Sequence, residues 1–545
     1  GAKHLPMAIT ASARDVQARA LSRDLPVVPV QGGRLKADAD VRSEGKKLDV
    51  FLSHLRGKLA ASGEKAVLNF EGKSLELESL ALNTQLKKAA FKQKSLGLDA
   101  KWQASLDGPG IDGKLDLDGM LWFGGNSRSA VFQNVPGKIN ISLDEKTGKI
   151  KGGLKADIAG NFSSRANQLE VKKASVSVSG LNITGNFDLD YGKNMAWKGD
   201  LKTETSNLPG DLQKLFGKSV KLPENLHHFS LESRFSGKQD VLTLSQIKSR
   251  LGPISIAGKL GIDYAKKTPA FNFDLQADKV DFAQFENSKK PANRNARWDF
   301  SSLRSFNADG KLEIASLAIF GTRFQKCSIP LALENAKLRA GPCAAIFYGA
   351  NLSLGARADF SKGISFNTNL EVLAFDIARV ARDHKMKSLL TGDASVKADM
   401  KAHLTGPGQI PGALDGAWSI RLKNGSWQKM GKDGKLGKPT RISLAEASGT
   451  MNKGVARTNN FYLQNNNLKV KGGGWINLTN QKQDCNFNVD MKGLPNFPLH
   501  LYGTLDKTQT SIGAGKMVMN ALGGITSGLV DIFGGLVEGT LNIFR

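Results

Sequence analysis

The chain has 545 residues, of which 40% are hydrophobic and 23% are charged, a composition that is ordinary for a folded protein. It excludes a chain that is mainly disordered and one that is too small to bury a core. Glycine is enriched at 59 residues, but the 17 prolines come without a Gly-X-Y period, which excludes a collagen.

The 76 basic residues outnumber the 50 acidic ones, which gives a net charge of +26. Such an excess indicates a polyanionic partner (nucleic acid, an anionic membrane surface or lipopolysaccharide), although a solvated basic surface would give the same count. The basic residues are spread over the whole chain and are not grouped with aromatic stacking platforms. We therefore expect no nucleic-acid partner.

The sequence lacks catalytic and metal-binding motifs, which predicts a non-enzymatic protein with no cofactor and no metal site. Its seven histidines form no HExxH pattern, and it has no GxSxG or Walker sequence. The cysteines Cys327, Cys343 and Cys485 have no metal-type spacing. Cys327 and Cys343 can pair across a hairpin in an oxidising compartment, or all three can be buried thiols. The spacing leaves both arrangements open.

Apolar and polar residues alternate along most of the chain, which is the period of a β-strand with one apolar and one wet face. The pattern is clear at residues 139–143 and 154–158, on either side of turn-forming residues 144–148, and it predicts a hairpin. Helical periodicity is nearly absent before residue 511. We therefore predict a mainly β chain with a long, twisted antiparallel sheet. At about 12 residues per strand and turn, the chain would hold roughly 45 strands.

Two ten-residue segments, residues 181–190 and 254–263, share their apolar positions and a central glycine, Gly185 in one and Gly258 in the other. A looser copy begins at Leu468. The repetition points to a β-module that has been lengthened by addition.

A second repeated element is an aspartate followed by an apolar residue. We expect each of these aspartates to cap the first turn of a short helix, with the next apolar residue tucked under the sheet. They are Asp15, Asp211, Asp281 and Asp376.

The strongest short hairpin signal in the sequence is Asn424 followed by Gly425, because both central positions of a type I′ turn need a positive φ. We predict a hairpin at this point, with Leu422 opposite Trp427.

Composition divides the chain into four parts. We predict a repetitive β-module region at residues 1–285, a polar, proline-broken linker at 286–300, a second β-domain at 301–510 and a glycine-rich amphipathic helical tail at 511–545. No stretch offers the roughly 20 apolar residues that a transmembrane helix needs. Because the chain opens at Gly1 without a signal peptide, we expect a missing N-terminal segment that carries a signal or an anchor.

In the tail, apolar residues recur at helical spacing while Asp531 and Glu538 stay on the polar side. Glycines weaken such a helix, so it needs an apolar surface to lie on: the protein's own sheet, a membrane or a helix of a partner. The residues predicted to contact a membrane or partner are Leu522, Ile525, Leu529, Ile532, Phe533, Leu536, Ile543 and Phe544.

The second β-domain carries short motifs in a fixed order: GKLEIASL at 310–317, IFYGA at 346–350, DIAR at 376–379, LTGDA at 390–394, LTGPG at 404–408, LDG at 414–416, NGSW at 424–427, NFYL at 460–463 and LKVKG at 468–472. In order and spacing this region resembles the C-terminal portion of the AsmA-like family, the TamB/YhdP type of bacterial envelope protein. Residues 1–285 are similar to the looser middle repeats of that family, and the glycine-rich tail is also similar. The N-terminal membrane anchor of the family is absent from this sequence.

The resemblance implies a long antiparallel sheet curled into a U-shaped, β-taco-like trough with an apolar interior and short capping helices. It implies a location in the periplasm of a Gram-negative bacterium, tethered to the inner membrane by the missing segment. It further implies a non-enzymatic conduit that moves phospholipid or another envelope lipid between inner and outer membranes, with membrane contact at one or both ends. The alternative is a structural or assembly factor of the TamB type, which docks an outer-membrane barrel protein by strand addition and assists its biogenesis.

Lipid transfer along a groove is physically compatible with the alternating pattern, because an acyl chain is stabilised by about 0.8 kcal/mol for each CH₂ that it buries. The alternating apolar residues are therefore the candidates to line the groove. They are Leu115, Leu117, Ile139, Ile141, Leu143, Leu154, Ile158, Ile183, Phe187, Ile254, Ile256, Leu260, Phe487 and Val489.

Overall fold

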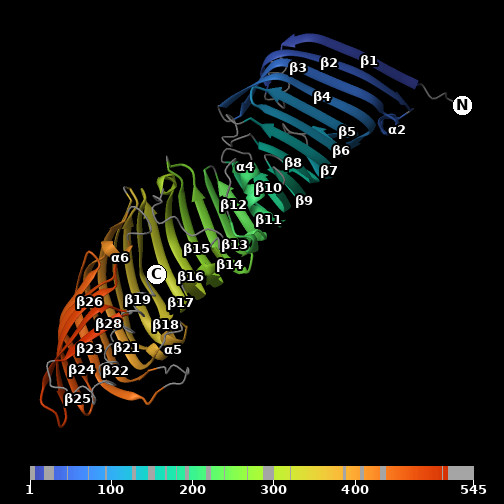
Figure 1. Ribbon diagram of the computed structural model, residues 1–545. Coiled ribbons are helices and arrows are strands. Elements are labelled where there is room, and N and C mark those ends of the chain that lie inside the picture. Colours follow the sequence, from blue (N-terminus) through green and yellow to red (C-terminus); the bar gives the residue numbers. More distant parts are fainter. Residues whose placement is uncertain are drawn as a thin grey trace. The chain divides into compact units, whose positions relative to one another are not determined.

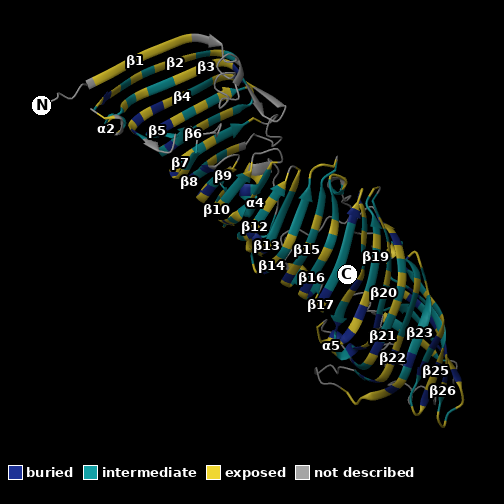
Figure 2. Cartoon of the chain, turned by 180° about the vertical axis from the view of Figure 1, so that it is seen from behind, coloured by how far each residue is buried: buried dark blue, intermediate teal, exposed yellow. Residues whose placement is uncertain are grey.

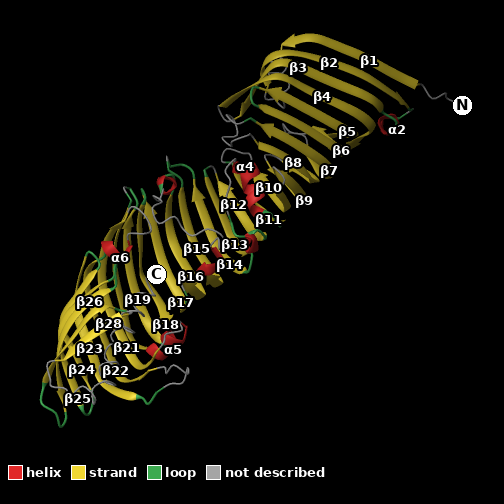
Figure 3. Ribbon diagram, viewed as in Figure 1, coloured by secondary structure: helices red, strands yellow, loops and turns green. Residues whose placement is uncertain are grey.

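The computed structural model of the chain is mainly β and contains one sheet of 28 strands. The prediction of a mainly β chain with one long sheet is confirmed. Figure 1 shows strands following one another in chain order, and Figure 3 shows that the helices between them are short. Among the described strands, the first pairs only with the second and the last only with the one before it, so the sheet is open.

The structure describes residues 6–17, 30–45, 47–70, 73–92, 95–124, 131–144, 154–165, 168–178, 181–190, 195–216, 222–238, 240–266, 268–285, 300–319, 321–361, 363–383, 388–404, 410–429, 437–505 and 507–512. Most of the predicted linker at 286–300 and nearly all of the predicted tail lie outside these ranges.

The chain divides into two compact units, Gly1–Pro253 (unit 1) and Ile254–Arg545 (unit 2). The elements of unit 1 are β1 (Pro6–Gln17), β2 (Val30–Glu44), α2 (Leu48–Ser53), β3 (Arg56–Phe70), β4 (Lys73–Lys92), β5 (Ser95–Gly108), β6 (Ile111–Gly124), β7 (Val131–Leu143), β8 (Leu154–Arg165), β9 (Gln168–Val178), β10 (Leu181–Asp190), β11 (Ala196–Thr205), α4 (Leu208–Phe216), the 3₁₀ helix η1 (Glu224–Leu226), β12 (Phe229–Lys238) and β13 (Val241–Leu251).

The elements of unit 2 are β14 (Ile254–Asp263), β15 (Ala270–Asp281), η2 (Phe282–Phe285), η3 (Ser301–Arg304), β16 (Asn307–Ile319), β17 (Thr322–Glu334), β18 (Lys337–Phe347), β19 (Ala350–Asp359), β20 (Ile364–Asp376), α5 (Ile377–Asp383), β21 (Ser388–Leu404), α6 (Ile410–Ala413), β22 (Asp415–Lys429), β23 (Thr440–Asn452), β24 (Val455–Gln464), β25 (Leu468–Asn477), β26 (Lys482–Met491), β27 (Phe497–Thr504) and β28 (Lys507–Ile512).

Two predictions about the sheet are wrong in detail. The estimate of roughly 45 strands is too high, because many strands are long; β4 alone has 20 residues. The sheet is also not wholly antiparallel, because β15 and β16 pair in parallel, with Ala270 opposite Asn307. The segment between them, which contains the predicted linker, returns the chain to the end of the sheet where β15 began. The next strand therefore runs in the same direction as β15.

Bulges keep the apolar side chains on one face where the alternation would otherwise slip. Between Val372 and Phe375, β20 advances three residues while its partner β21 advances two, from Val396 to Ala394. Ala374, inside the bulge, has a φ of 58°. Because successive strand residues alternate between faces, the extra residue returns Phe375 to the same face as Val372. Phe375 is accordingly buried.

The repeated segments of the sequence are equivalent strands: residues 181–190 are β10 and residues 254–263 are β14, each ten residues long. The looser copy is β25, which also has ten residues. At the shared glycine the neighbouring strand approaches closely. A Cβ placed on Gly185 would lie 1.9 Å from the carbonyl oxygen of Asp200, and one on Gly258 would lie 2.1 Å from that of Asp274.

The predicted hairpin at Asn424 and Gly425 is wrong. Both residues lie inside β22, where Asn424 takes a φ of 53° at an irregularity in the pairing with β21. A left-handed asparagine suits a bulge as well as a turn, so the dipeptide does not distinguish the two. In the described part of the chain, two-residue turns with positive φ at both positions occur instead at Asn335–Ala336, Tyr348–Gly349 and Lys453–Gly454.

The aspartate caps are confirmed in unit 2. The backbone N–H of Ala283 donates to Asp281 at 3.0 Å, and that of Ala378 donates to Asp376 at 3.0 Å. The prediction is wrong at Asp211, because α4 begins at Leu208 and the side-chain oxygen of Asn207 accepts the backbone N–H of Gly210 at 3.2 Å in its place. The prediction is also wrong at Asp15, which lies within β1 at an irregularity in the pairing with β2.

The face opposite the apolar residues carries cross-strand ion pairs between residues that lie directly opposite one another. Lys202 contacts Glu232 at 2.7 Å, and Lys397 contacts Glu371 at 2.6 Å. The hydrogen bond from Lys202 lowers the pKa of the Glu232 carboxyl. All four side chains are exposed, so the pairs favour the observed register but add little to the free energy of unfolding.

The close approach at Gly258 predicts that Gly258→Ala lowers the free energy of unfolding by about 1–3 kcal/mol, because the new methyl group would clash with the backbone of β15. Gly261→Ala, on the same strand, is the control, since its Cβ would lie 3.7 Å from the nearest atom. The measurement is the urea midpoint of each variant. Equal midpoints for the two would contradict this account of the shared glycine.

Candidate functional site

In unit 1 the predicted lining residues share one face of the sheet, which we call the apolar face. The register places Leu115 opposite Ile139 and Ile139 opposite Ile158, and it places Leu143 opposite Leu154. Because side chains two residues apart on a strand share a face, Leu117 and Ile141 belong to the same set. Figure 2 shows the alternation of exposed and less exposed residues along these strands.

Strand β9 pairs with both β8 and β10, so it makes the apolar face of unit 1 continuous between them. Val176 is the register partner of both Ile158 on β8 and Ile183 on β10. Val171, nearby on β9, is the partner of Phe187. The predicted residues of unit 1 are thus brought together across five consecutive strands.

In unit 2 the predicted lining residues lie at two places. On β14, Ile254 is buried, Ile256 lies opposite Ala277, and Leu260 lies opposite Phe273. On β26, Phe487 and Val489 are 4% and 1% exposed. The predicted residues of the tail, from Leu522 to Phe544, lie outside the described residues.

Phe487 and Val489 belong to a closely packed core rather than to an open surface. The core is formed by β18 to β27 and includes side chains that are at most 2% exposed, such as Leu422, Val470 and Leu499. Around Phe487 and Val489 neighbouring side chains fill the space, whereas other members of the same cluster, such as Phe375 and Phe461, line the second cavity described below.

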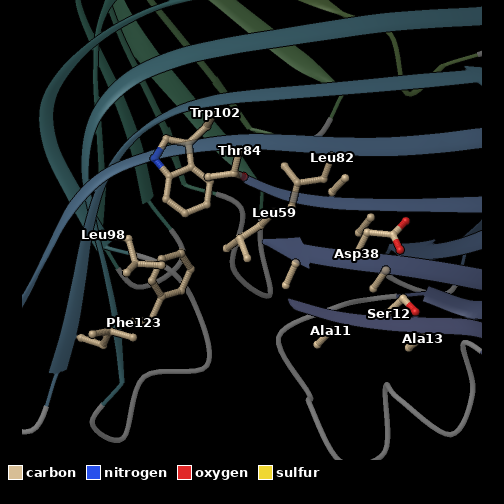
Figure 4. A pocket seen from close by; sticks show the side chains of 15 residues that line it. Ala11, Ser12, Ala13, Asp38, Leu59, Leu82, Thr84, Leu98, Trp102 and Phe123 are labelled. Atoms are coloured by element: carbon tan, nitrogen blue, oxygen red, sulfur yellow. The ribbon is translucent and has the colours of Figure 1, made fainter. Parts of the chain in front are cut away.

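A cavity of about 450 Å³ lies in unit 1, bounded by β1 to β6 (Figure 4). Its walls combine short side chains, such as Ala11, Ala39 and Ala61, with larger ones, such as Trp102 and Phe123. The rings of Trp102 and Phe123 lie 5.7 Å apart. Asp38 is the one charged residue among the described residues that line the cavity.

A second cavity, of about 470 Å³, lies within unit 2. Its lining residues come from strands as far apart as β16 (Leu317) and β26 (Cys485). In a flat sheet with about 4.8 Å between strands, β16 and β26 would lie roughly 48 Å apart. The sheet of unit 2 therefore bends around this cavity. Its lining is almost wholly apolar, with Glu446 as the one charged residue among the described ones.

All three cysteines line the cavity of unit 2 as buried free thiols, which is one of the two arrangements that the sequence allowed. Burial raises the pKa of each thiol, from the ordinary 9.0 to about 12 for Cys485. The thiolate is the form that attacks substrates and binds metals. The raised pKa therefore disfavours both roles near neutral pH.

The helix α5 packs beside this cavity. Ile377 and Val380 on α5 join the same apolar cluster as Phe347 and Phe375, which line the cavity. The hydroxyl of Tyr348 donates a hydrogen bond to Asp383 at the end of α5, at 2.9 Å. Burial, followed by this hydrogen bond, raises the pKa of Tyr348 well above its ordinary value. The helix is thus held by both apolar and polar contacts.

The described residues offer no cluster of three or more His, Cys, Asp or Glu side chains that could hold a metal ion. Among the helices in the described part of the chain, none is long and apolar enough to span a membrane. Comparisons with protein-family models, with curated proteins and with solved structures gave no match. The geometry of the two apolar cavities is therefore the main guide to function.

The sequence analysis missed the residues that line the cavities: none of the predicted lining residues takes part in either one. It ranked residues by hydrophobic alternation, which favours Leu, Ile, Val and Phe. The walls of the cavity in unit 1 are instead rich in alanine. Short side chains leave space on a sheet surface, so a run of alternating alanines, as at Ala11 and Ala13, was the available signal.

The raised pKa of Cys485 predicts that this thiol does not react with iodoacetamide in the folded protein at pH 8, while it reacts readily in urea. Asn488→Cys, on the exposed face of the same strand, is the control and should react quickly in the folded protein. Ionisation of the Cys485 thiol should also destabilise the fold as pH rises from 9.0 toward about 12, because only the unfolded chain ionises in that range. Rapid labelling of Cys485 in the folded state would contradict its placement.

Proposed function

We propose that the protein is a non-enzymatic lipid-transfer conduit that moves phospholipid between inner and outer membranes in the periplasm of a Gram-negative bacterium. In this proposal the sheet forms a U-shaped trough, and its apolar face is the interior along which acyl chains travel. The resemblance to the AsmA-like family supports the proposal. The excess of basic residues also supports it, because it favours contact with anionic membrane surfaces.

The observation that carries the proposal is that both units hold a cavity of several hundred Å³ with almost wholly apolar walls. Cavities of this size accept small organic molecules. An apolar cavity left unfilled lowers the free energy of unfolding, so an apolar occupant would stabilise the fold. Acyl chains fit this chemistry because each buried CH₂ contributes about 0.8 kcal/mol.

The face of the sheet opposite the apolar residues is polar, and this bears on where the headgroup of a bound lipid would lie. This opposite face of the sheet carries exposed ion pairs such as Lys202–Glu232, and few charged residues line the cavities. A charged headgroup would therefore stay at the hydrated rim while the chains lie on the apolar face. Membrane contact by the tail and an N-terminal tether complete the proposal.

Lipid extraction of the purified protein followed by mass spectrometry tests the proposal directly. We expect phospholipid to co-purify with the protein, because the apolar cavities favour an apolar occupant. Recovery of protein without any bound lipid would count against a conduit.

Ile256→Asp places a charge on the apolar face of β14, and we expect it to abolish lipid passage between donor and acceptor vesicles while the sheet stays folded. The reason is that Ile256 is only partly buried, and a carboxylate there repels acyl chains. Ala257→Asp adds the same charge to the exposed face of the same strand and should transfer lipid normally. Unfolding of Ile256→Asp, seen by circular dichroism, would favour a closed sandwich core instead.

The open edges of the sheet favour a second candidate, the assembly factor. On β1 the side chains of Met7 and Ile9 are 45% and 49% exposed, and one side of the strand is free to pair with an added strand. Photocrosslinkers placed at Met7 and at Leu59, which lines the cavity, distinguish the two functions. Capture of an outer-membrane barrel protein at β1 supports assembly, while capture of phospholipid at Leu59 supports transport.

A further inference from the structure

Thr84 on β4 is a polar side chain on the apolar face of unit 1, and it is only 4% exposed. The register places it between Leu59 on β3 and Trp102 on β5. Its side chain lines the cavity, as Figure 4 shows. Among the described residues, its hydroxyl makes no hydrogen bond.

Several other buried polar side chains in the described part of the chain are hydrogen-bonded, although the indole N–H of Trp427 has no partner. Thr203, on the apolar face of the same unit and 5% exposed, donates to the carbonyl oxygen of Asn182 at 2.8 Å. Ser233 donates to the carbonyl oxygen of Ser245 at 2.9 Å, and Gln483 donates to Thr508 at 2.6 Å. A buried hydroxyl without a partner destabilises the fold, so its presence in a cavity wall indicates a ligand atom.

We propose that the cavity of unit 1 is a binding site for an ester-linked acyl lipid, in which the hydroxyl of Thr84 donates a hydrogen bond to the ester carbonyl oxygen. The inference rests on the proposed function and adds to it the position and the polar group by which the lipid is held. The hydrocarbon chain lies against Leu59, Leu82 and Trp102, and the carbonyl is the one polar group that has to enter the apolar part of the site.

The composition of the cavity wall selects a neutral carbonyl over a carboxylate. No Lys, Arg or His is among the described lining residues, so a carboxylate would have no cation to pair with. Asp38, the one charged lining residue, is itself acidic and supplies no cation. An ester carbonyl is an uncharged acceptor, and a threonine hydroxyl satisfies it with one hydrogen bond.

The test is a competition between two lipids that differ only in the carbonyl. The full chain is incubated with equal amounts of dioleoyl phosphatidylethanolamine and its dialkyl ether analogue in detergent micelles, and the retained lipids are counted by mass spectrometry. We expect the unchanged protein to retain the ester lipid about 2- to 10-fold over the ether lipid, which is the effect of one neutral hydrogen bond.

Variants assign that preference to Thr84. Thr84→Val keeps the shape and removes the hydroxyl, and it should bring the ester-to-ether ratio to about one, while Thr84→Ser should keep the preference. Thr203→Val removes an equally buried hydroxyl that already has a partner, and it should leave the ratio unchanged. An unchanged ratio in Thr84→Val would overturn the inference.

The stability of the delipidated variants gives an independent readout. We expect Thr84→Val to melt at the same temperature as the unchanged protein or higher, because it removes an unpartnered hydroxyl. Thr203→Val should melt lower, because it leaves the carbonyl of Asn182 without its partner. A fall in the melting temperature of Thr84→Val similar to that of Thr203→Val would assign the Thr84 hydroxyl a structural partner and overturn the inference.

The competition also separates this inference from the proposed function. If the unchanged protein and Thr84→Val both retain ester and ether lipids equally, the role of Thr84 is wrong and the conduit stands. If the unchanged protein retains neither lipid, the proposed function fails, and the inference fails with it.

Discussion

Each strand presents every second side chain to one face of the sheet, so a slip of one residue would move a strand's apolar side chains into water. The register prevents this in both units, where apolar residues such as Leu115 and Ile139, or Leu260 and Phe273, lie directly opposite one another. Where the alternation would otherwise turn an apolar side chain to the wrong face, a bulge restores it, as the one at Ala374 does for Phe375. The apolar face, the cavities and the exposed ion pairs all depend on this alternation of side chains between the two faces.

The size of the side chains is one factor in what the apolar face becomes, although the cavity of unit 2 is lined by large side chains such as Phe347, Phe375 and Trp418. Where large side chains meet from several strands, as around Phe487 and Leu499, they fill the space and form a dry core. Where alanines replace them, as on β1 to β3, the same alternation leaves a cavity. The two outcomes have opposite effects on stability, because a packed core stabilises the fold and an unfilled apolar cavity does not.

The ion pairs of the sheet contribute little to the stability of the protein. The ion pairs on the wet face are exposed and directly opposed, so they reinforce register while adding little free energy. The net charge of +26 is what remains after every acidic residue is subtracted from the basic ones, so these pairs do not reduce it, and it favours long-range attraction to anionic surfaces. In the proposed conduit, attraction to the membrane and binding of the acyl chain thus lie on opposite faces of the same strands.

The sequence by itself determined the fold class, the identity of the apolar face and the equivalence of β10 and β14, because these depend on a period of two that is local to each strand. It also determined the caps at Asp281 and Asp376, since a capping aspartate needs only its next neighbours. The tertiary structure decided the rest. Asn424 became a bulge because its flanking segments pair with β21 and β23 rather than with each other, and β16 runs parallel to β15 because of the long return between them. The cavities and the unpartnered hydroxyl of Thr84 depend on which side chains from different strands fail to fill a shared space, and a pattern read along one strand contains no information about that space.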